Sequence, residues 1–252
     1  MDKRDTPLID AQDLPAALGL LSRLPVPVQA DRAMARGAAA AWAYPLAGVL
    51  LGVIVAAGIA LLLWVGLPGG IVAALALALS VILTGAMHED GLADSADGLW
   101  GGWDRARRLA IMKDSHIGTY GVIALALTLL IRWLVLVALV ATDTYWTALI
   151  GAGALSRAGM VVLMGTMMHA RADGLSRHVG RPEARTVWLA VAIAAVAGLI
   201  CVGFGAVLLA MGAVVVCGLI ARTKIGGQTG DILGATQQIT EIAVLLAVVA
   251  AL

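Results

Sequence analysis

The chain has 252 residues, of which 61% are hydrophobic and 13% are charged, and its formal net charge is +1. A soluble domain has about 45–50% apolar and roughly 25% charged residues, so this composition excludes both a soluble globular domain and a disordered chain. The small net charge gives no electrostatic support for a nucleic-acid partner. The sequence therefore predicts a protein whose solvent is the lipid bilayer.

The N-terminal segment is predicted to lie at the membrane interface. Residues 1–13 carry charges of both signs, which is not typical of a cleavable signal peptide. Asp10–Leu24 is predicted to form a short amphipathic helix, which Pro25 and Pro27 would end.

Long uncharged or nearly uncharged runs predict the membrane spans, because about 20 helical residues cross a bilayer. The runs are Gly37–Leu67, Ile71–Met87, Ile117–Ala141, Trp146–Met168, Thr186–Ala221 and Ile239–Leu252. At 1.5 Å per residue, Thr186–Ala221 would be about 54 Å long as one helix, so we expect two helices that divide near Gly203-Phe204-Gly205. The last helix should begin nearer Asp231. The prediction is an all-α polytopic membrane bundle with about seven transmembrane helices and one domain, residues 1–252.

Basic residues predict the orientation of the bundle. All of them except Arg132 and Arg157 fall in four segments that seven spans would place on one side. These segments are residues 1–36, 88–116, 169–185 and 222–238. The positive-inside rule assigns that side to the cytoplasm, so we expect a cytoplasmic N-terminus and a cytoplasm-facing active site.

An acidic segment follows directly after the second span. If that helix continues through Asp97, then Asp90, Asp94 and Asp97 lie on one face, at the helix C-terminus where the dipole disfavours anions. A divalent cation would relieve their repulsion, and oxygen ligands favour Mg²⁺ or Mn²⁺. A solvated acidic helix end is the alternative. His88 is the only histidine expected in this site.

Basic and glycine-rich segments supply candidate phosphate contacts. Four side chains in the loop after the acidic segment either clamp phosphate oxygens or serve as topology signals: Arg105, Arg107, Arg108 and Lys113. Gly118 and Gly121 either admit an anion at a helix N-terminus or pack against another helix.

Charged residues within or beside later spans need partners. Arg157 is predicted to face the bundle, whereas Arg132 is expected to snorkel toward the far interface and is left out of the site. Asp231 either caps the last helix or completes a metal shell with Glu241.

The order of these motifs resembles the cobalamin synthase family, the adenosylcobinamide-GDP ribazoletransferases. The segments that carry the resemblance are Leu21–Pro27, Met87–Leu99, Ile111–Gly121, Ser156–Arg157, His169–Leu175, Gly227–Asp231 and Leu233–Ala235. Two positions depart from the family pattern: His116 stands where arginine is frequent, and His169 where tyrosine is frequent.

The resemblance implies a transferase of the bacterial inner membrane that joins adenosylcobinamide-GDP to α-ribazole or its 5′-phosphate and releases GMP. Residues at matched positions then take expected roles. The expected Mg²⁺ ligands are Glu89, Asp90, Asp94, Asp97, Asp114 and Asp231. The expected catalytic residues are His88, Asp94, Asp97, Lys113 and Arg157. The expected substrate-binding residues are Arg105, Arg108, Gly118, Thr119 and Gly230. Homo-oligomerisation stays open.

Two other functions were weighed against the sequence. A CDP-alcohol phosphotransferase pattern begins to match at Asp94-Ser95-Ala96-Asp97-Gly98, but Gly101-Gly102 replaces its Ala-Arg pair and its later Gly and Asp are absent. An ion-coupled transporter would carry its site near the bilayer midplane, whereas these acids gather toward one surface. Release of GMP would distinguish the transferase from both.

Overall fold

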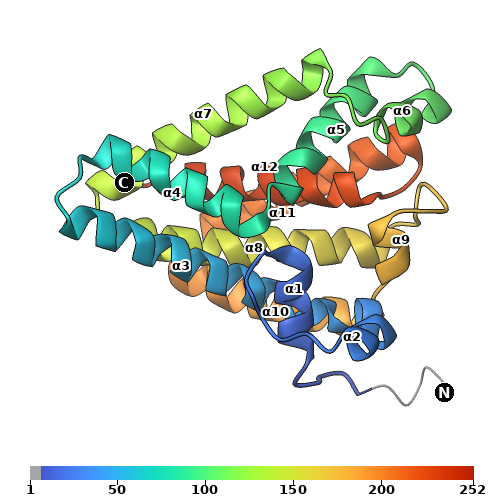
Figure 1. Ribbon diagram of the computed structural model, residues 1–252, viewed down its shortest axis with the longest axis horizontal. Coiled ribbons are helices and arrows are strands. Elements are labelled where there is room, and N and C mark those ends of the chain that lie inside the picture. Colours follow the sequence, from blue (N-terminus) through green and yellow to red (C-terminus); the bar gives the residue numbers. More distant parts are fainter. Residues whose placement is uncertain (1–6) are drawn as a thin grey trace.

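The computed structural model describes residues 7–252 as a helical bundle (Figure 1). Part of the charged N-terminal segment, residues 1–6, lies outside the described residues. Within 7–252 the only β-type pairing is an isolated parallel bridge between His169 and Gln228. The prediction of an all-α fold is confirmed.

The helices follow one another with short connections. They are α1 Asp13–Leu21, α2 Ala30–Arg36, η2 Gly37–Ala43, α3 Tyr44–Trp64, α4 Gly69–Thr84, α5 Met87–Gly101, α6 Arg105–Ile111, α7 Thr119–Ala141, α8 Tyr145–Thr166, α9 Leu175–Val179, α10 Ala184–Cys201, α11 Gly203–Ile225 and α12 Gly230–Val249. Among the described residues, six helical segments are long and apolar enough to cross a membrane, and α4 with α5 makes a seventh when the bent pair is one span.

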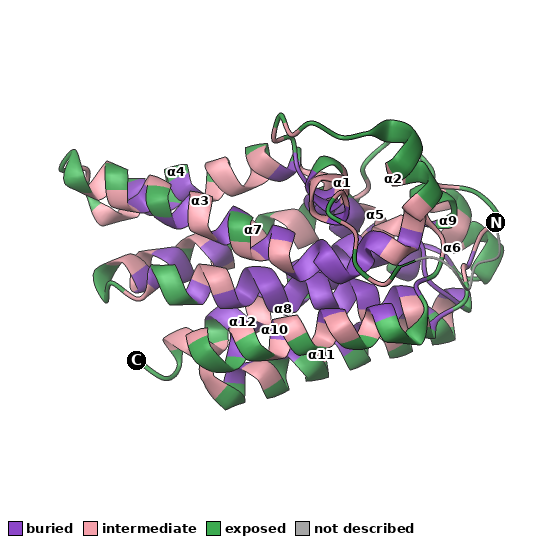
Figure 2. Cartoon of the chain, turned by 90° about the horizontal axis from the view of Figure 1, so that it is seen from below, coloured by how far each residue is buried: buried purple, intermediate pink, exposed green. Residues whose placement is uncertain are grey.

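Helix α8 forms the centre of the bundle and is buried along most of its length (Figure 2). It packs against α3, α10 and α12. Gly48 of α3 and Gly153 of α8 meet so closely that a Cβ on either would overlap the other's carbonyl oxygen, which is the small-residue packing typical of membrane helices. The outer helices α7, α10 and α11 leave most of their apolar surface exposed, as lipid-facing helices do.

The predicted N-terminal helix is present but shorter than Asp10–Leu24. Helix α1 ends at Leu21, and Ala17, Leu18 and Leu21 are buried in a core cluster with residues of η2 and α3. Its apolar side therefore packs on protein. An interfacial position for this helix stays a prediction.

Two predictions about the last helices are confirmed and one is wrong. Gly203, with φ +80°, separates α10 from α11, as the length of the apolar run required. Helix α12 begins at Gly230, next to the predicted Asp231, and it includes the charged Glu241. Its N-cap is Thr229, whose hydroxyl accepts a hydrogen bond from the Ile232 amide at 3.3 Å. Asp231 is therefore not the cap, because it lies inside the first turn.

The second span does not continue through the acidic segment. Gly85 and Ala86 both have positive φ, 64° and 58°, and the chain bends by 87° between α4 and α5. Figure 1 shows the two helices meeting part-way along the bundle. Glu89 and Asp90 consequently lie in the first turn of α5, where the helix dipole favours anions. The expectation that Asp90 sits at a helix C-terminus is therefore wrong, whereas Asp97 does lie near the C-terminal end of α5.

Candidate active site

The closest approach of α5 and α12 is made by glycines. A Cβ on Gly91 would lie 2.8 Å from the Asp231 carbonyl oxygen, and a Cβ on Gly234 would lie 3.3 Å from the His88 Cα atom. Only residues without side chains allow the two backbones to lie this close. The crossing brings Asp90 of α5 and Asp231 of α12 to the same cavity.

The loop that carries Arg171 is fixed to the start of α12. The Gln228 amide donates to the Met168 carbonyl and the Ala170 amide donates to the Gln228 carbonyl, both at 2.8 Å. Arg171 then follows, and its Nη2 atom donates to Asp231 Oδ2 at 2.8 Å. Arg171 Nη1 is buried and has no hydrogen-bond partner among the described residues. Arg171 was not among the residues predicted for the site, because its charge was interpreted only as a topology signal.

These residues enclose a cavity of about 230 Å³ between α1, α3, α5, α8, α9 and α12. We call it the acidic cavity. Its polar lining consists of Asp90, Asp231, Arg171, His88, Ser176 and Tyr44. Half-buried Asp94 lies close enough to interact with the charges of Asp90, Asp231, Asp97 and Arg171. Three carboxylates and one guanidinium give this region an excess of negative charge.

His88 lies on the inner wall of the acidic cavity. Its side chain is 1% exposed, and neither ring nitrogen has a hydrogen-bond partner among the described residues. It also lines a second, small cavity of about 40 Å³ deeper in the bundle. Gly230 lines the acidic cavity as well, so the predicted His88, Asp90, Gly230 and Asp231 are brought together.

Asp97 has a different environment. Its carboxylate accepts hydrogen bonds from the Gly118 amide at 2.7 Å and from the Gly121 amide at 2.9 Å. A Cβ at either glycine would overlap this carboxylate. The N-terminus of α7 therefore binds an anion, as the glycines indicated, but the anion is the side chain of Asp97. Thr119 begins α7 and is exposed.

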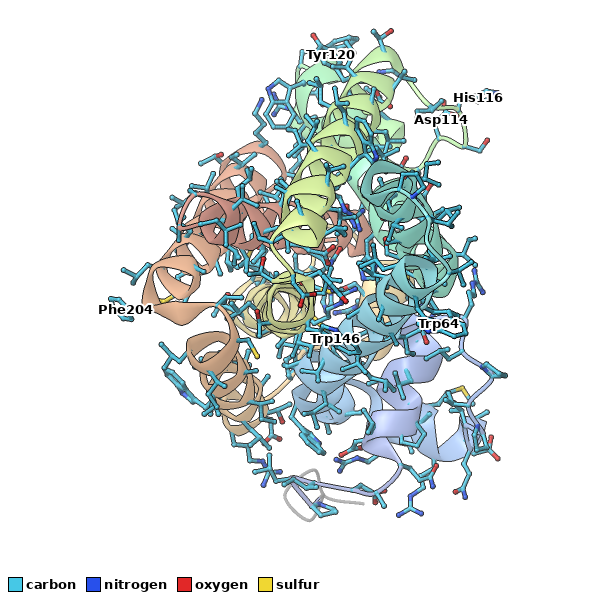
Figure 3. All side chains as sticks on the ribbon, turned by 90° about the vertical axis from the view of Figure 1, so that its left-hand side faces the viewer. Trp64, Asp114, His116, Tyr120, Trp146 and Phe204 are labelled. Atoms are coloured by element: carbon cyan, nitrogen blue, oxygen red, sulfur yellow. The ribbon has the colours of Figure 1, made fainter. Side chains whose placement is uncertain are left out.

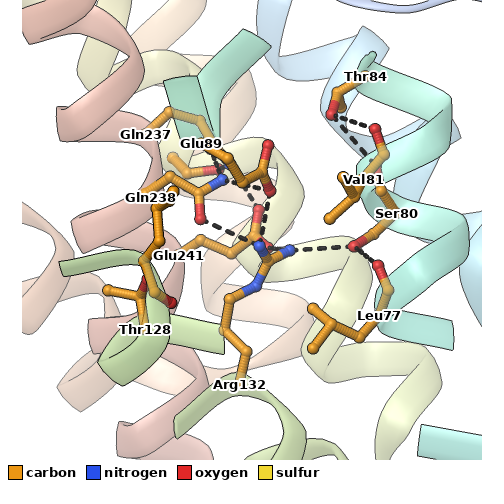
Figure 4. A network of polar contacts seen from close by, with 12 residues as sticks. Leu77, Ser80, Val81, Thr84, Glu89, Thr128, Arg132, Gln237, Gln238 and Glu241 are labelled. Carbon is orange, nitrogen blue, oxygen red and sulfur yellow. Dashed lines mark hydrogen bonds and ion pairs between the residues drawn. The ribbon is translucent and has the colours of Figure 1, made fainter. Parts of the chain in front are cut away.

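Glu89 belongs to a buried polar network rather than to the acidic cavity (Figure 4). Arg132 Nη1 donates to Glu89 Oε1 at 2.8 Å, and its Nη2 donates to Glu241 Oε1 at 3.1 Å. Arg157 Nη1 donates to Glu241 Oε2 at 2.9 Å. Gln238 adds bonds to Glu89 and Arg132. We call these five residues the buried network.

The buried network tests the predictions for Arg132 and Arg157, the two arginines within spans. Arg157 is buried and faces the bundle, as expected. Arg132 is 5% exposed and points into the protein, so the expectation that it snorkels to the interface is wrong. An unpaired guanidinium in hydrocarbon is so costly that such groups generally pair with residues on other helices. The position of the charged Arg132 within an apolar span could therefore have indicated buried partners.

The remaining predicted residues lie toward the periphery. Arg105 donates to the carbonyls of Ile225 and Ala170, at 2.7 and 2.8 Å, and Arg108 donates to those of Gly102 and Lys224, at 2.9 and 3.0 Å. Both arginines thus tie down the end of α11.

Lys113 and Asp114 lie in the exposed loop between α6 and α7. Lys113 pairs with Asp173, and its hydrogen bond lowers the pKa of that carboxyl group. Asp114 pairs with His116, whose hydrogen bonds lower the pKa of Asp114. Figure 3 shows Asp114 and His116 at the edge of the molecule.

The six predicted metal ligands therefore fall into four places. Asp90, Asp94 and Asp231 lie at or beside the acidic cavity, whereas Glu89, Asp97 and Asp114 have separate partners. Within residues 7–252, no group of three or more His, Cys, Asp or Glu side chains is arranged to hold a metal ion by itself.

Comparison with known proteins identifies the family of the chain. The family model described as cobalamin-5-phosphate synthase matches residues 13–249. A Bradyrhizobium diazoefficiens protein named adenosylcobinamide-GDP ribazoletransferase is 44% identical over 93% of this chain and 92% of its own length. Proteins of the same name from Mesorhizobium japonicum and Azorhizobium caulinodans are each 46% identical, over 93% and 94% of this chain and 91% and 94% of their own lengths. No solved structure matches. The chain belongs to the cobalamin-5-phosphate synthase family.

Proposed function

We propose that the chain is a transferase of cobalamin biosynthesis that joins adenosylcobinamide-GDP to α-ribazole or α-ribazole 5′-phosphate. A ribose hydroxyl oxygen of the acceptor bonds to the phosphorus that carries cobinamide, the diphosphate P–O bond breaks, and GMP leaves. The product is adenosylcobalamin or its 5′-phosphate. Family membership and the names of the relatives support this reaction.

The observation that carries the proposal is the composition of the acidic cavity. Asp90 and Asp231 face the same space as His88 and Arg171, and one buried nitrogen of Arg171 has no hydrogen-bond partner within residues 7–252. The unpaired guanidinium nitrogen suits a phosphate oxygen, and phosphoryl transfer depends mainly on positioning and on charge neutralisation. A cavity of about 230 Å³ holds only the reacting part of a corrinoid nucleotide.

Magnesium dependence is part of the proposal. Without a cation, the carboxylates of the cavity would repel a diphosphate. Mg²⁺ usually takes one or two carboxylates plus phosphate oxygens, and Asp90 and Asp231 can supply the protein's share, with Asp94 beside them. When bound, the ion supplies charge neutralisation for the diphosphate. We leave Glu89, Asp97 and Asp114 out of the proposed ligand set because the buried network, the α7 amides and His116 already engage them.

The other residues of the cavity act by direct contact. Arg171 is held by Asp231 in a position to donate its second nitrogen to the transferred phosphate. His88 lies in the inner wall of the cavity, where both ring nitrogens are buried without a hydrogen-bond partner among the described residues. One of the carboxylates accepts the proton of the attacking hydroxyl group, which is ordinary general-base chemistry.

The reaction is proposed to occur at the cytoplasmic surface of the bacterial inner membrane. The basic α6 and α9 segments lie at the same end of the bundle as α2, and the C-terminus lies at the other end (Figures 1 and 2). The positive-inside rule assigns the basic end to the cytoplasm.

The test uses the purified protein in lipid nanodiscs with adenosylcobinamide-GDP, α-ribazole 5′-phosphate and Mg²⁺. We expect GMP and a corrinoid product, detected by chromatography, and their loss in EDTA or in Asp231→Asn. Asp143→Asn is the matched control, because Asp143 is exposed in the α7–α8 turn away from the cavity and asparagine tolerates its positive φ. Folded protein that makes no GMP, or that releases CMP from a CDP-alcohol, would refute the proposal.

A further inference from the structure

Another cavity, distinct from the small one beside His88, adjoins the acidic cavity on the side of the N-terminal helices. Its volume is about 360 Å³, and its walls come from α1, α2, η2, the start of α3, and α9. Four residues line both cavities: Leu20, Tyr44, Leu175 and Val179. We call this space the apolar chamber. The two spaces are therefore neighbours on either side of these four residues, and a ligand that passes between them would reach both.

The chamber is built for an apolar group. Of the residues that the structure describes, no Asp, Glu, Lys or Arg lines it, and the side chains that α1, α2 and η2 contribute are mostly small, including Ala16, Ala33 and Ala40. Its polar side chains are Tyr44 and His178, and His178 Nδ1 already contacts the Gly174 carbonyl at 2.8 Å. A ligand with several donors and acceptors would lose hydrogen bonds to water here without replacement, which is unfavourable.

Contacts around Asp13 hold the walls of the chamber in place. Asp13 is fully buried, and its carboxylate accepts hydrogen bonds from Arg36 Nε at the end of α2 and from Trp42 Nε1 of η2, both at 2.7 Å. Arg36 Nη1 also donates to the Pro7 carbonyl at 2.6 Å. The arrangement of α1, α2 and η2 is thereby fixed around one carboxylate, so the chamber exists before a ligand arrives.

We propose that the apolar chamber binds the benzimidazole base of α-ribazole, while the ribose extends past Leu20 and Leu175 into the acidic cavity. This inference rests on the proposed function. A dimethylbenzimidazole that is joined to ribose has no N–H group and carries two methyl groups, so it suits an uncharged chamber. Guanine, the base of the other substrate, presents several donors and acceptors that the chamber does not match.

The first experiment fills the chamber from its outer wall. Ala33 of α2 is half-buried and lines the chamber, so Ala33→Trp should occupy the space of the base. We expect the KM and the calorimetric Kd of α-ribazole to rise by roughly tenfold to a hundredfold, the value of burying one apolar ring, and the KM of adenosylcobinamide-GDP to stay unchanged. Ala30→Trp on the same helix is the matched control, because Ala30 is exposed and lines neither cavity.

A second variant avoids any strain that tryptophan introduces. Met34 is 73% exposed and lines the chamber, so Met34→Ala removes ligand contacts without emptying the core. We expect a rise of about threefold to tenfold in the Kd of α-ribazole. Free dimethylbenzimidazole should compete with α-ribazole for the wild-type protein and not for Ala33→Trp.

The outcomes separate this inference from the proposed function. Wild-type protein that makes no GMP refutes the function, and the inference then stands only if α-ribazole binds and Ala33→Trp weakens that binding. If the wild type is active but the variants raise the KM of adenosylcobinamide-GDP instead, the chamber holds the donor's base and the inference is wrong. Unchanged constants for both substrates also overturn it.

Discussion

Glu89 and Asp90 are neighbours in the chain, but they belong to two polar clusters of opposite character. Glu89 joins the buried network, where two carboxylates meet the guanidinium groups of Arg132 and Arg157. Asp90 faces the acidic cavity, where it and Asp231 have Arg171 as their cation and Asp94 lies beside them. Successive side chains on a helix point about 100° apart, so α5 serves both clusters with adjacent residues.

The difference indicates which cluster is structural. In a medium without water, charges must be neutralised by the protein or by a ligand. The buried network neutralises its own charges and has little free volume, about 40 Å³. The acidic cavity has several times that volume and is lined by two carboxylates and one guanidinium, an excess of negative charge that the proposed Mg²⁺ would neutralise. Predictions that act on one cluster and spare the other test this interpretation.

The largest expected effect comes from removing a cation of the buried network. Arg132→Leu leaves Glu89 without its charged partner and leaves Arg157 as the charged partner of Glu241. We expect a loss of about 3–5 kcal/mol in the free energy of unfolding, the usual cost of breaking a buried pair on one side. Thermal unfolding in nanodiscs measures it. The double variant Arg132→Leu/Glu89→Gln should recover part of the loss, and no recovery would argue against the pairing.

The adjacent acids should respond differently to conservative amide substitutions. Asp90→Asn should reduce magnesium-dependent GMP release by about 10²-fold or more, near 3 kcal/mol, because it removes a proposed metal ligand. Its unfolding temperature should stay near the wild-type value, because Asp90 is exposed. Glu89→Gln should lower the unfolding temperature and leave the magnesium concentration for half-maximal activity unchanged. The reverse pattern would exchange the roles of the two clusters.

A methyl group at the crossing of α5 and α12 should affect both clusters. Gly91→Ala places a Cβ 2.8 Å from the Asp231 carbonyl oxygen, so the helices must separate. We expect a loss of about 1–3 kcal/mol in stability together with reduced activity. Gly212→Ala in α11 is the control, because nothing lies within 4 Å of its added Cβ, and it should be neutral or stabilising. An inactive variant of normal stability would limit the effect to the acidic cavity.

The smallest effect concerns the loop that places Arg171. Burial lowers the pKa of His169 from its ordinary 6.5, with Arg177 and Arg181 adding to the effect. His169 therefore binds a proton more readily in the unfolded chain than in the folded one. The stability that comes from burying the neutral His169 ring is present above pH 6.5 and is lost as the pH falls below it. Hydrogen exchange of the Ala170 and Gln228 amides should quicken in acid. His169→Tyr should abolish the change, and persistence of the change would assign it elsewhere.

The sequence predicted the spans well because their signals are local. The uncharged run Thr186–Ala221 is too long for one span, and the chain does divide there, with α11 beginning at Gly203. Both α7 and α8 begin within two residues of the expected position. The break before α5 was not predicted. Gly85 could have indicated it, but Ala86 carries no signal for its left-handed conformation.

The candidate site was predicted in part, because its residue types are local and its partners are not. The acids and His88 are visible as a cluster in the chain. Which acid faces which partner depends on the rotation of α5 against α7 and α12. Arg132 meets Glu241 across 109 residues, and Arg171 meets Asp231 across 60. Those pairings require the packed bundle.

The break at Gly85 and Ala86 also limits how this segment can vary. The rotation of α5 is set by the count of residues between the break and Asp90. One inserted or deleted residue would turn the following helix by about 100°, and would move Asp90 away from the acidic cavity and Glu89 away from Arg132. Relatives should therefore differ here by substitution and keep the length of the segment fixed.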